Sequence, residues 1–360
     1  MKIVLNMSVL GKNPTGLGVY SQHTCNRVSS YFNAKIIGGS KNENIKGEII
    51  IQAPESISLG SKSTFATLRR LLWLSKIKFN THQYLVYSPT HHGLTNQKNQ
   101  IITIHDLICI HHKKQHRFQY LYFKYYLPYL IRKCRAIFTV SQTSKEEIAN
   151  YYKFPLEKIF VIPNGVDRAV YTSVPNRKKE NFLLMVGARY PHKNVEDVLR
   201  NSAYWKDQYT LIVASCSESY KRELEEIVIS EKLGNQVIFK DYLSQTELIN
   251  LYQTCSALVY PSKWEGFGIP PLEALACGAN VIASDIPVHR EVLGDAVTYI
   301  EIGKKESWKK AFEDLENNTI QNSKALEIER VLKKYSWDQA ADKLKDVLIS
   351  LEPTLELNIK

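Results

Sequence analysis

The sequence contains few cysteines, and none lies in a pattern that binds metal or builds a disulfide framework. The six cysteines are far apart in 360 residues and include no Cys-x-x-Cys pair, which argues against a zinc knuckle and a disulfide-stapled secreted domain. No apolar run approaches the ~18 residues of a membrane-spanning helix. The N-terminal stretch MKIVLNMSVL is typical of a strand rather than of a secretory signal. We therefore expect a cytoplasmic protein.

Three common nucleotide-binding signatures are also missing. The stretch Gly16–Ser21 lacks the third glycine of the dinucleotide fingerprint, and no acidic residue follows where one would hold a ribose. Neither a G-x-x-x-x-G-K-[ST] phosphate loop nor an Asp-x-Asp pair for a divalent metal occurs. The adjacent histidines at 91–92 and 111–112 lack the spacing of metal ligands. We expect neither a nicotinamide enzyme nor a P-loop NTPase, and we expect no metal and no cofactor.

Acidic residues are scarce in the first half of the chain. Residues 1–175 contain 23 Lys and Arg against 8 Asp and Glu, within a formal net charge of +11 for the whole sequence. The remaining residues carry slightly more acids than bases. This imbalance indicates that a polyanionic ligand or surface, if there is one, faces the first half only.

Two segments concentrate this positive charge among aromatic residues, namely 68–79 and 111–135. Both are typical of amphipathic helices, whose apolar faces pack on the domain while their basic faces are solvated. In the alternative interpretation they bind anionic lipid headgroups or a lipid pyrophosphate, with Tyr, Phe and Trp at the interface. The protein is then peripheral on the inner face of the cytoplasmic membrane. No nucleic-acid-binding motif accompanies the charge, so we expect no nucleic acid partner.

Short apolar runs alternate with helical patterns along the chain, in a composition that is 44% hydrophobic and 23% charged. The runs expected to be strands are 3–5, 49–51, 85–87, 101–104, 137–140 and 160–162, then 182–186, 211–214, 237–239, 257–260, 281–283 and 297–300. Helices are expected at 144–152, 219–231, 245–254, 272–277 and 337–351. This alternation predicts an α/β fold with two doubly wound parallel sheets.

The two sheets divide the chain into domains. We expect an N-terminal Rossmann-like domain at 1–172, a C-terminal Rossmann-like domain at 173–336, and a final helix and tail at 337–360. Ligands of open α/β sheets bind beyond the carboxyl ends of the strands. We therefore expect the strand-end loops of both domains to face a cleft between them.

The loop after the first strand of the second half carries two cations. Arg189 and Lys193 follow the run 182–186, and no acidic residue lies between that run and Glu196. Cations at the carboxyl end of a strand can pair directly with a diphosphate, and each charge-assisted contact contributes about 1.5–3 kcal/mol. The alternative is a pair of solvated loop cations.

A glycine-containing loop at 264–268 follows the strand expected at 257–260, and a pair of prolines then begins an apolar helix. The amides of 266–269 and the helix N-terminus suit the hydroxyls and phosphates of a sugar nucleotide. We expect Glu265 in the loop and Glu273 in the first helical turn. Carboxylates accept hydrogen bonds from vicinal diols, so these two can hold a hexose and a ribose together.

Glu265 and Glu273, with seven residues between them, resemble the E-x7-E signature of retaining glycosyltransferases of the GT4 type, which have the GT-B fold. The other stretches that resemble this family are 277–285, 291–296, 162–167, Ser141, and His105 with Asp106. The resemblance runs along most of the chain and is densest from 160 to 300. It implies two Rossmann-like domains facing an interdomain cleft.

The resemblance also implies roles for individual residues. Arg189 and Lys193 match the pair that holds the donor diphosphate and stabilises the leaving nucleotide. Glu265 matches a glutamate on the donor sugar, Glu273 one on the ribose, and His105 a histidine near the transferred sugar; an ordinary strand-end histidine is the alternative for His105. The other implied donor-binding positions are Gly16 and Gly18 in a glycine loop before a helix near Val19, Asp241, Tyr242 and Leu243 around the base, and the amides of Phe267, Gly268 and Ile269.

The resemblance implies a retaining hexosyltransferase of the bacterial surface-polysaccharide and lipopolysaccharide type, as in O-antigen or capsule synthesis. The donor is a nucleotide diphosphate sugar, with GDP-mannose favoured over UDP-hexoses and dTDP-sugars. The acceptor is an oligosaccharide or a sugar linked to a lipid pyrophosphate. Two alternatives stay open: a nucleotide-sugar epimerase on the same fold, and a non-catalytic basic protein that binds membrane or nucleic acid.

Overall fold

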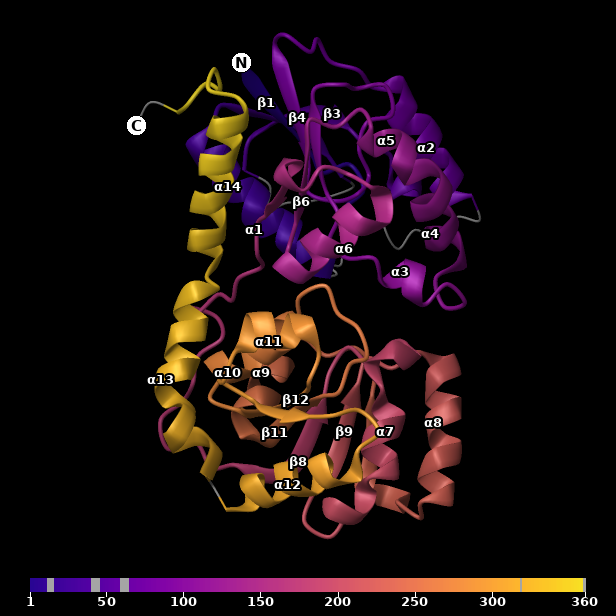
Figure 1. Ribbon diagram of the computed structural model, residues 1–360, viewed down its shortest axis with the longest axis vertical. Helices are drawn as coiled ribbons and strands as arrows, with labels where there is room; N and C mark the ends of the chain where they lie inside the picture. The colour runs from indigo at the N-terminus through magenta and orange to yellow at the C-terminus, as the bar shows by residue number, and fades with distance from the viewer. Residues whose placement is uncertain (12–15, 40–45, 59–64, 318, 359–360) are drawn as a thin grey trace. The chain divides into compact units, whose positions relative to one another are not determined.

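The computed structural model describes residues 1–11, 16–39, 46–58, 65–317 and 319–358. The chain divides into two compact units (Figure 1). Unit 1 comprises Met1–Gly165 together with Trp337–Lys360, and unit 2 comprises Val166–Ser336. The expected boundary between 172 and 173 therefore differs from the observed division by seven residues. The expected separate segment at 337–360 groups with unit 1.

Unit 1 is built on a seven-stranded sheet in which neighbouring strands pair in parallel, in the order β3-β2-β1-β4-β5-β6-β7. Its strands are β1 (Lys2–Asn6), β2 (Ala34–Gly38), β3 (Glu48–Gln52), β4 (Tyr84–Ser88), β5 (Gln100–Thr103), β6 (Ala136–Thr139) and β7 (Ile159–Val161). The central strands β1, β4, β5 and β6 are buried almost throughout. Burial on both faces is expected of a parallel sheet covered by helices on each side.

The helices of unit 1 cover both faces of this sheet (Figure 1). They are α1 (Gly16–Tyr31), α2 (Ala66–Lys76), α3 (Ile108–His111), α4 (Arg117–Leu121), the π-helical turn η2 (Tyr122–Tyr126), α5 (Leu127–Ile131), α6 (Gln142–Tyr152) and α14 (Trp337–Leu351), with short 3₁₀ turns η1 (Glu55–Ile57) and η3 (Leu156–Lys158). The elements α4, η2 and α5 follow one another without a break from 117 to 131. The basic segment expected at 111–135 is thus largely one helix, widened in its middle by a π turn.

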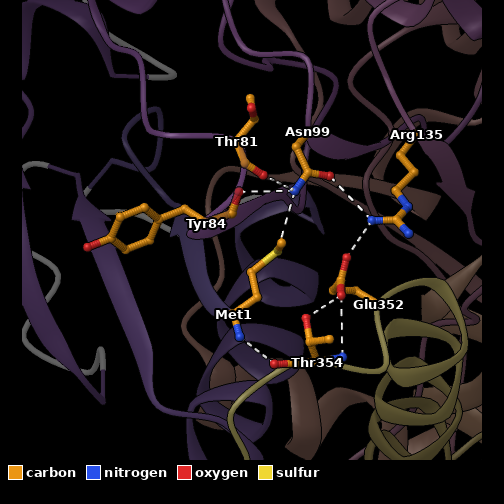
Figure 2. Close-up of polar contacts among 7 residues, drawn as sticks. All are labelled: Met1, Thr81, Tyr84, Asn99, Arg135, Glu352 and Thr354. Atoms are coloured by element: carbon orange, nitrogen blue, oxygen red, sulfur yellow. Dashed lines mark hydrogen bonds and ion pairs between the residues drawn. The ribbon is translucent and has the colours of Figure 1, made fainter.

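The C-terminal helix α14 packs on α1 inside unit 1 (Figure 1). The Trp337 ring stacks on His23 with a centroid distance of 4.5 Å, and Arg27 Nε donates to Asp338 at 2.8 Å. Beyond the helix, Arg135 Nη1 donates to Glu352 Oε2 at 2.7 Å (Figure 2). These contacts join the C-terminal helix and the turn after it to α1 and to the residue before β6.

Figure 2 also shows how the turn after α14 is fastened next to the N-terminus. The Met1 amino group donates to the Thr354 carbonyl, and the Thr354 amide and hydroxyl both donate to Glu352. Asn99 donates to the carbonyls of Thr81 and Tyr84, at 3.1 Å each. Residues from both ends of the chain therefore complete one hydrogen-bonded edge of unit 1.

Unit 2 contains a six-stranded parallel sheet in the order β10-β9-β8-β11-β12-β13. Its strands are β8 (Glu180–Met185), β9 (Thr210–Ala214), β10 (Val237–Lys240), β11 (Cys255–Tyr260), β12 (Asn280–Ser284) and β13 (Thr298–Ile300). The direction of chain progression reverses between β8 and β11. At such a reversal the loops leaving the two strands diverge and open a crevice at the carboxyl edge of the sheet.

Seven helices are described in unit 2. They are α7 (Val195–Arg200), α8 (Glu218–Ser230), α9 (Gln245–Thr254), α10 (Ile269–Ala276), α11 (Pro287–Leu293), α12 (Lys305–Glu316) and α13 (Thr319–Lys334), with 3₁₀ turns η4 (Pro191–Lys193), η5 (Ser202–Tyr204) and η6 (Gly234–Gln236). Local sequence explains several of their starts. Ser244 and Glu247 form a capping box at the start of α9, and Ser217 caps α8.

Three details differ from the sequence-based expectations. The strand β2 is not among the predicted strands, although it pairs with both β1 and β3. The helix α10 begins at Ile269 instead of Leu272, so Glu273 lies in the second turn and not in the first. The helix α1 begins at Gly16 instead of near Val19, so Gly16 and Gly18 lie in its first turn and not in a loop before it.

Candidate active site

An ion pair joins the loops that follow β8 and β11. Lys193, the last residue of η4, places its Nζ 2.5 Å from Glu265 Oε1 and 3.1 Å from the Tyr260 hydroxyl. Tyr260 ends β11, and Glu265 lies five residues further on. The pair therefore sits where the strand order of unit 2 reverses, which is the position where open α/β sheets bind ligands.

The two charges stabilise each other in a buried environment. Burial by itself disfavours both charged forms, raising the pKa of Glu265 and lowering that of Lys193. Their mutual attraction and hydrogen bonding outweigh burial, so that the pKa of Glu265 falls to about 2 and the pKa of Lys193 rises above its ordinary value. At neutral pH the site therefore holds a carboxylate and an ammonium side by side.

The backbone fixes the position of Lys193 from both sides. Asn194 adopts a left-handed conformation with φ 61°, and its side-chain amide donates to the Pro261 carbonyl at 3.2 Å. The amide of Lys263 donates to the His192 carbonyl at 2.8 Å. These bonds tie the loop after β8 directly to the loop after β11. The ammonium is thus presented by a rigid turn and not by a long flexible loop.

Arg189 lies in the same loop but in a different environment. Its side chain is exposed, and its guanidinium lies 5.8 Å from the centroid of the Tyr190 ring. Within the described ranges it has no carboxylate partner. The turn before it needs a left-handed residue, which Gly187 supplies with φ 68°. Arg189 therefore contributes a second positive charge to the loop that carries Lys193, and within the described chain no carboxylate neutralises it.

The three residues after Glu265, Gly266 to Gly268, are buried. Phe267 is buried, and its ring meets Tyr335 edge-on at 5.3 Å. Gly268 has φ 90°, a conformation that residues with a β-carbon rarely adopt, and it caps the N-terminus of α10. Because Pro270 and Pro271 have no N–H, the amide donors nearest this terminus are those of 266–269.

Glu273 points to a separate part of the same unit. Burial raises its pKa, although hydrogen bonds from Tyr171 and Tyr252 work against that rise. The Tyr252 hydroxyl donates to Glu273 Oε2 at 3.1 Å. The two carboxylates therefore have different partners: Glu265 pairs with the ammonium of Lys193, whereas Glu273 accepts hydrogen bonds from two tyrosine hydroxyls. The E-x7-E spacing does not reveal this difference.

The residues expected around the base lie at the edge of the sheet. Asp241, Tyr242 and Leu243 follow β10, the edge strand, which β9 separates from β8. Tyr242 is 79% exposed. In the described part of the chain, Lys193 and Glu265 bond to each other and to Tyr260, and not to these three residues. Their role in donor binding stays a prediction.

The expected site residues of unit 1 lie at the amino end of α1 and in the segment that follows β5 in the sequence. Gly16 is exposed with open space where a β-carbon would stand, whereas Gly18 is buried. His105 follows β5, and its Nε2 lies 3.0 Å from the Pro89 carbonyl, so Nε2 carries the proton. Burial lowers the pKa of His105 to about 4. Its ring also meets Tyr20 edge-on at 4.6 Å, so it is a neutral, oriented imidazole.

Several polar side chains around Lys193, Glu265 and Glu273 are not predicted from the sequence. Tyr260 bonds Lys193, Tyr252 and Tyr171 surround Glu273, and His289 lies buried beside Tyr260. The only sequence signal for Tyr260 is its place at the end of a predicted strand. For the others the signal is absent, because their proximity depends on how helices pack on the sheet.

Metal sites and membrane-spanning helices are the remaining features that bear on function. Among the residues it describes, no group of three or more His, Cys, Asp or Glu is arranged to hold a metal ion. Metal-independent catalysis stays a prediction, because it concerns the reaction and not the apo chain. Over the same described ranges, no helix is both long and apolar enough to cross a bilayer.

Two family models match consecutive parts of the chain. The model described as Glycosyltransferase Family 4 matches residues 55–170, and the model described as Glycosyl transferases group 1 matches residues 171–339. The second match contains the Lys193–Glu265 pair and the whole of β8 to β13.

Curated relatives extend the match over most of the sequence. The O-antigen chain mannosyltransferase RfbU of Salmonella typhimurium is 34% identical over 327 residues, covering 87% of this chain and 91% of RfbU. The O-antigen chain mannosyltransferase B of Escherichia coli is 25% identical over 247 residues, 63% of either chain. The serotype-specific mannosyltransferase WbdA of Escherichia coli is 30% identical over 215 residues, which cover 54% of this chain and 26% of WbdA.

Solved structures of low sequence identity share the fold. Anabaena HepE, in complex with UDP and glucose, has a TM-score of 0.73 at 15% identity, covering 97% of this chain and 100% of HepE. Sucrose-phosphate synthase from Thermosynechococcus elongatus has a TM-score of 0.75 at 16% identity, covering 97% and 98%. The predicted fold class of two Rossmann-like parallel-sheet domains of the GT-B type is confirmed. The chain belongs to the family 4 glycosyltransferases and is a hexosyltransferase with the GT-B fold.

Proposed function

We propose that this chain transfers mannose from GDP-mannose, with retention of configuration, to an acceptor in O-antigen or related surface-polysaccharide synthesis. The relatives named above support mannose, since RfbU, WbdA and mannosyltransferase B are all named as mannosyltransferases. The acceptor is an oligosaccharide or a sugar on a lipid pyrophosphate. The reaction takes place in the cytoplasm, where nucleotide sugars are the available donors.

The observation that carries the proposal is the buried Lys193–Glu265 pair at the strand reversal of unit 2. A cation and a carboxylate held together match the two ends of a sugar diphosphate, which has phosphate oxygens at one end and hydroxyl donors at the other. In our proposal Lys193 and the exposed Arg189 bind the diphosphate, Glu265 accepts from the sugar hydroxyls, and Glu273 accepts from the ribose.

The catalytic role of these residues follows from where charge develops. As the bond from the sugar to the phosphate breaks, the sugar becomes cation-like and the diphosphate gains negative charge. Preorganised cations and amide dipoles stabilise that charge without reorganising during the reaction. The acceptor hydroxyl attacks from the face that the diphosphate leaves, and its proton passes to a departing phosphate oxygen. No carboxylate nucleophile is needed in this scheme.

We further propose that unit 1 binds an anionic membrane surface through segments 68–79 and 111–135. The face of the helix at 117–131 that carries Phe118, Leu121, Tyr125 and Tyr129 is exposed, and Phe118 is 81% exposed. Lys124 Nζ lies 5.2 Å from the Tyr125 ring centroid. Apolar side chains flanked by cations are typical of helices that lie at an anionic lipid interface.

The helix α2 adds a second exposed apolar face to this surface. Leu68 and Leu72 are both more than half exposed, while the neighbouring Leu71 packs against the core cluster that contains Phe123 and Leu127. The two helices therefore share one core and both expose apolar side chains. Large exposed apolar side chains on neighbouring helices are typical of interaction sites.

The donor is tested with a panel of nucleotide sugars. We expect GDP-mannose to raise the thermal midpoint and to be hydrolysed slowly or transferred to an acceptor, whereas UDP-hexoses and dTDP-sugars act weakly. Transfer to any acceptor would exclude the epimerase alternative. Absence of both hydrolysis and transfer with every donor would favour the non-catalytic alternative and would contradict the proposed function.

A further inference from the structure

His289 is a buried histidine directly behind the sugar-binding loop. It lies in α11, five residues after Ser284 at the end of β12, and its side chain is inaccessible to solvent. Neither the strand pattern nor the E-x7-E spacing draws attention to it. It nevertheless lies close to the Lys193–Glu265 pair, since both charges act on its pKa.

The hydrogen bonds of His289 determine which ring nitrogen carries the proton. Nδ1 lies 2.9 Å from the Ser284 carbonyl oxygen, which can only accept. Ser284 Oγ donates its own proton to the Ser262 carbonyl at 2.6 Å, so toward Nδ1, at 3.2 Å, it also acts as an acceptor. Nδ1 is therefore protonated. Because burial lowers the pKa of the ring, Nε2 is a bare acceptor.

Nε2 has no hydrogen-bond partner in the part of the chain that the structure describes, although it is buried. A buried acceptor that loses its hydrogen bond to water destabilises the protein by about 1–3 kcal/mol. Such groups are uncommon in native proteins and therefore call for a specific explanation. A donor that arrives with a ligand explains an acceptor that is oriented, neutral and unsatisfied in the free chain.

The edge of the ring that bears Nε2 faces Gly268. A β-carbon at Gly268 would lie 3.7 Å from both Nε2 and Cδ2 of His289 and 3.6 Å from Tyr260 Cε1. Gly268, in the loop proposed to hold the sugar, therefore lies directly against the ring edge that bears Nε2. Tyr260, whose ring centroid lies 5.5 Å from that of His289, also bonds Lys193, so the imidazole and the ion pair belong to one cluster.

The chemistry of Nε2 selects between the groups of a sugar diphosphate. A bare nitrogen lone pair repels phosphate oxygens, which carry no proton at neutral pH, and it attracts a hydroxyl. We infer that His289 Nε2 accepts a hydrogen bond from a hydroxyl of the transferred sugar and so contributes to donor-sugar specificity. This inference rests on the proposed function, because it requires the loop at 266–269 to hold the sugar.

Two substitutions separate this role from a purely structural one. Asn places a donor where Nδ1 lies and keeps the bond to Ser284, but it has no acceptor at the position of Nε2. Gln reaches the position of Nε2 with its carbonyl oxygen but loses the bond to Ser284. We expect His289→Asn to weaken GDP-mannose binding about tenfold and His289→Gln to stay within about threefold of the wild type, on the scale of one neutral hydrogen bond.

Binding of GDP, which has no hexose, is the internal control in this experiment. Both variants should bind GDP as the wild type does, within about twofold, when affinities are measured by calorimetry. The four monodeoxy derivatives of GDP-mannose then identify the hydroxyl. One of them should bind the wild type and His289→Asn equally, because the lost hydroxyl and the lost acceptor are the same contact.

Several outcomes would overturn the inference while leaving the proposed function intact. They are wild-type affinity for GDP-mannose in His289→Asn, weaker binding in His289→Gln than in His289→Asn, or equal losses for GDP and GDP-mannose. If the panel selects a UDP-hexose, that donor and UDP replace the guanosine pair. If the wild type transfers no sugar at all, the proposed function itself fails.

A measurement on the unmutated chain covers the case in which a variant does not fold. In ¹⁵N NMR of the histidine rings, the Nε2 resonance of His289 should move toward the hydrogen-bonded range when GDP-mannose is added. It should stay unchanged with GDP. A resonance that is unaffected by GDP-mannose, in a chain that turns this donor over, contradicts the inference.

Discussion

Lys193 and Glu265 are 72 residues apart in sequence, yet they form a buried ion pair between the loops that follow β8 and β11. Because the two strands are neighbours at the reversal of the sheet, the pair needs no long loop to form it. A buried ion pair adds little net stability compared with apolar residues of the same size. Because the pair lies at the edge where open α/β sheets bind ligands, its presence is more readily explained by binding than by folding.

Replacing the cations should reduce turnover strongly. In Arg189→Ala and in Lys193→Met, the developing charge on the diphosphate loses a preorganised partner. A contact of this kind contributes about 2.7–4 kcal/mol to transition-state stabilisation, which corresponds to a loss of at least ~100-fold in kcat. Steady-state kinetics with the donor selected by the panel measures this effect.

Arg200→Ala provides the matched control, since Arg200 is an exposed cation at the end of α7 in the same unit. It should keep kcat within about twofold of the wild type, as expected of surface substitutions. Wild-type turnover in both Arg189→Ala and Lys193→Met would refute the assignment of the two cations to the diphosphate.

The stability of unit 2 should depend on pH through Glu265. The folded carboxyl has a pKa of about 2, below its ordinary 4.5, so its contribution is present above pH 4.5 and is lost as the pH falls toward 2. The expected loss is on the order of 3 kcal/mol. Urea unfolding followed by circular dichroism between pH 5 and pH 2 measures it.

Glu265→Gln is the reference for this titration, because it keeps the shape of the side chain and removes the ionisable group. Its unfolding free energy should fall less steeply over the same pH range than that of the wild type. Other carboxylates titrate in both proteins and cancel in the difference. Parallel curves would show that Glu265 has an ordinary pKa in the folded chain.

Activity should persist in EDTA. The stabilisation of the leaving diphosphate is assigned to Arg189, Lys193 and backbone amides, so chelating divalent ions should change kcat by less than about twofold. The assay uses protein dialysed against EDTA, with Mg²⁺ and Mn²⁺ added back separately. Complete loss of activity that Mn²⁺ restores would contradict metal-free catalysis.

Membrane binding should respond to both charge and apolar contact. Sedimentation with vesicles should increase with the fraction of anionic lipid and decrease as salt rises. The double variant Phe118→Ser with Tyr125→Ser should bind at least about fivefold less, because two exposed rings no longer enter the interface.

Leu326→Ser tests whether any exposed apolar side chain has the same effect, since Leu326 is 90% exposed but lies in unit 2. It should bind vesicles as the wild type does. Binding that is absent, or that does not change with salt, would leave α2 and the helix at 117–131 as ordinary packing elements. Competition by nucleic acid at equal charge would favour the polyanion alternative.

The turn after α14 should stabilise unit 1. Glu352→Ala removes the bond to Arg135 and the two bonds from Thr354 (Figure 2). Since Arg135 is partly exposed, we expect a loss of about 1 kcal/mol in the free energy of unfolding. Glu301→Ala, which breaks a largely exposed pair with Lys304, should leave the free energy of unfolding close to that of the wild type.

The alternation of apolar runs and helical patterns predicts both sheets because strands buried on two faces are apolar throughout. The strand β2 is not predicted, because the charged residue Lys35 interrupts its apolar run. In the structure Lys35 forms an ion pair with Glu48 on the neighbouring strand β3. The start of α10 is also mispredicted. Pro270 and Pro271 fit the first helical turn, as the sequence indicates, but Ile269 already precedes them in the helix.

The candidate site is only partly predictable from the sequence. The E-x7-E spacing and the cations after β8 identify Lys193 and Glu265 individually, but not that they bond each other. That contact depends on β8 and β11 being neighbours, which the linear sequence does not reveal. The positions of Tyr260 and His289 depend in addition on how side chains pack behind the sheet.

The return of α14 to unit 1 has a consequence for how the protein is made. Unit 2 is continuous in sequence, whereas unit 1 lacks the partner of α1 until residues 337–351 have left the ribosome. On a nascent chain, the later-encoded unit can therefore reach its native state first. Unit 1, which is encoded first, is completed only when α14 emerges, and until then Trp337 does not cover the surface around His23.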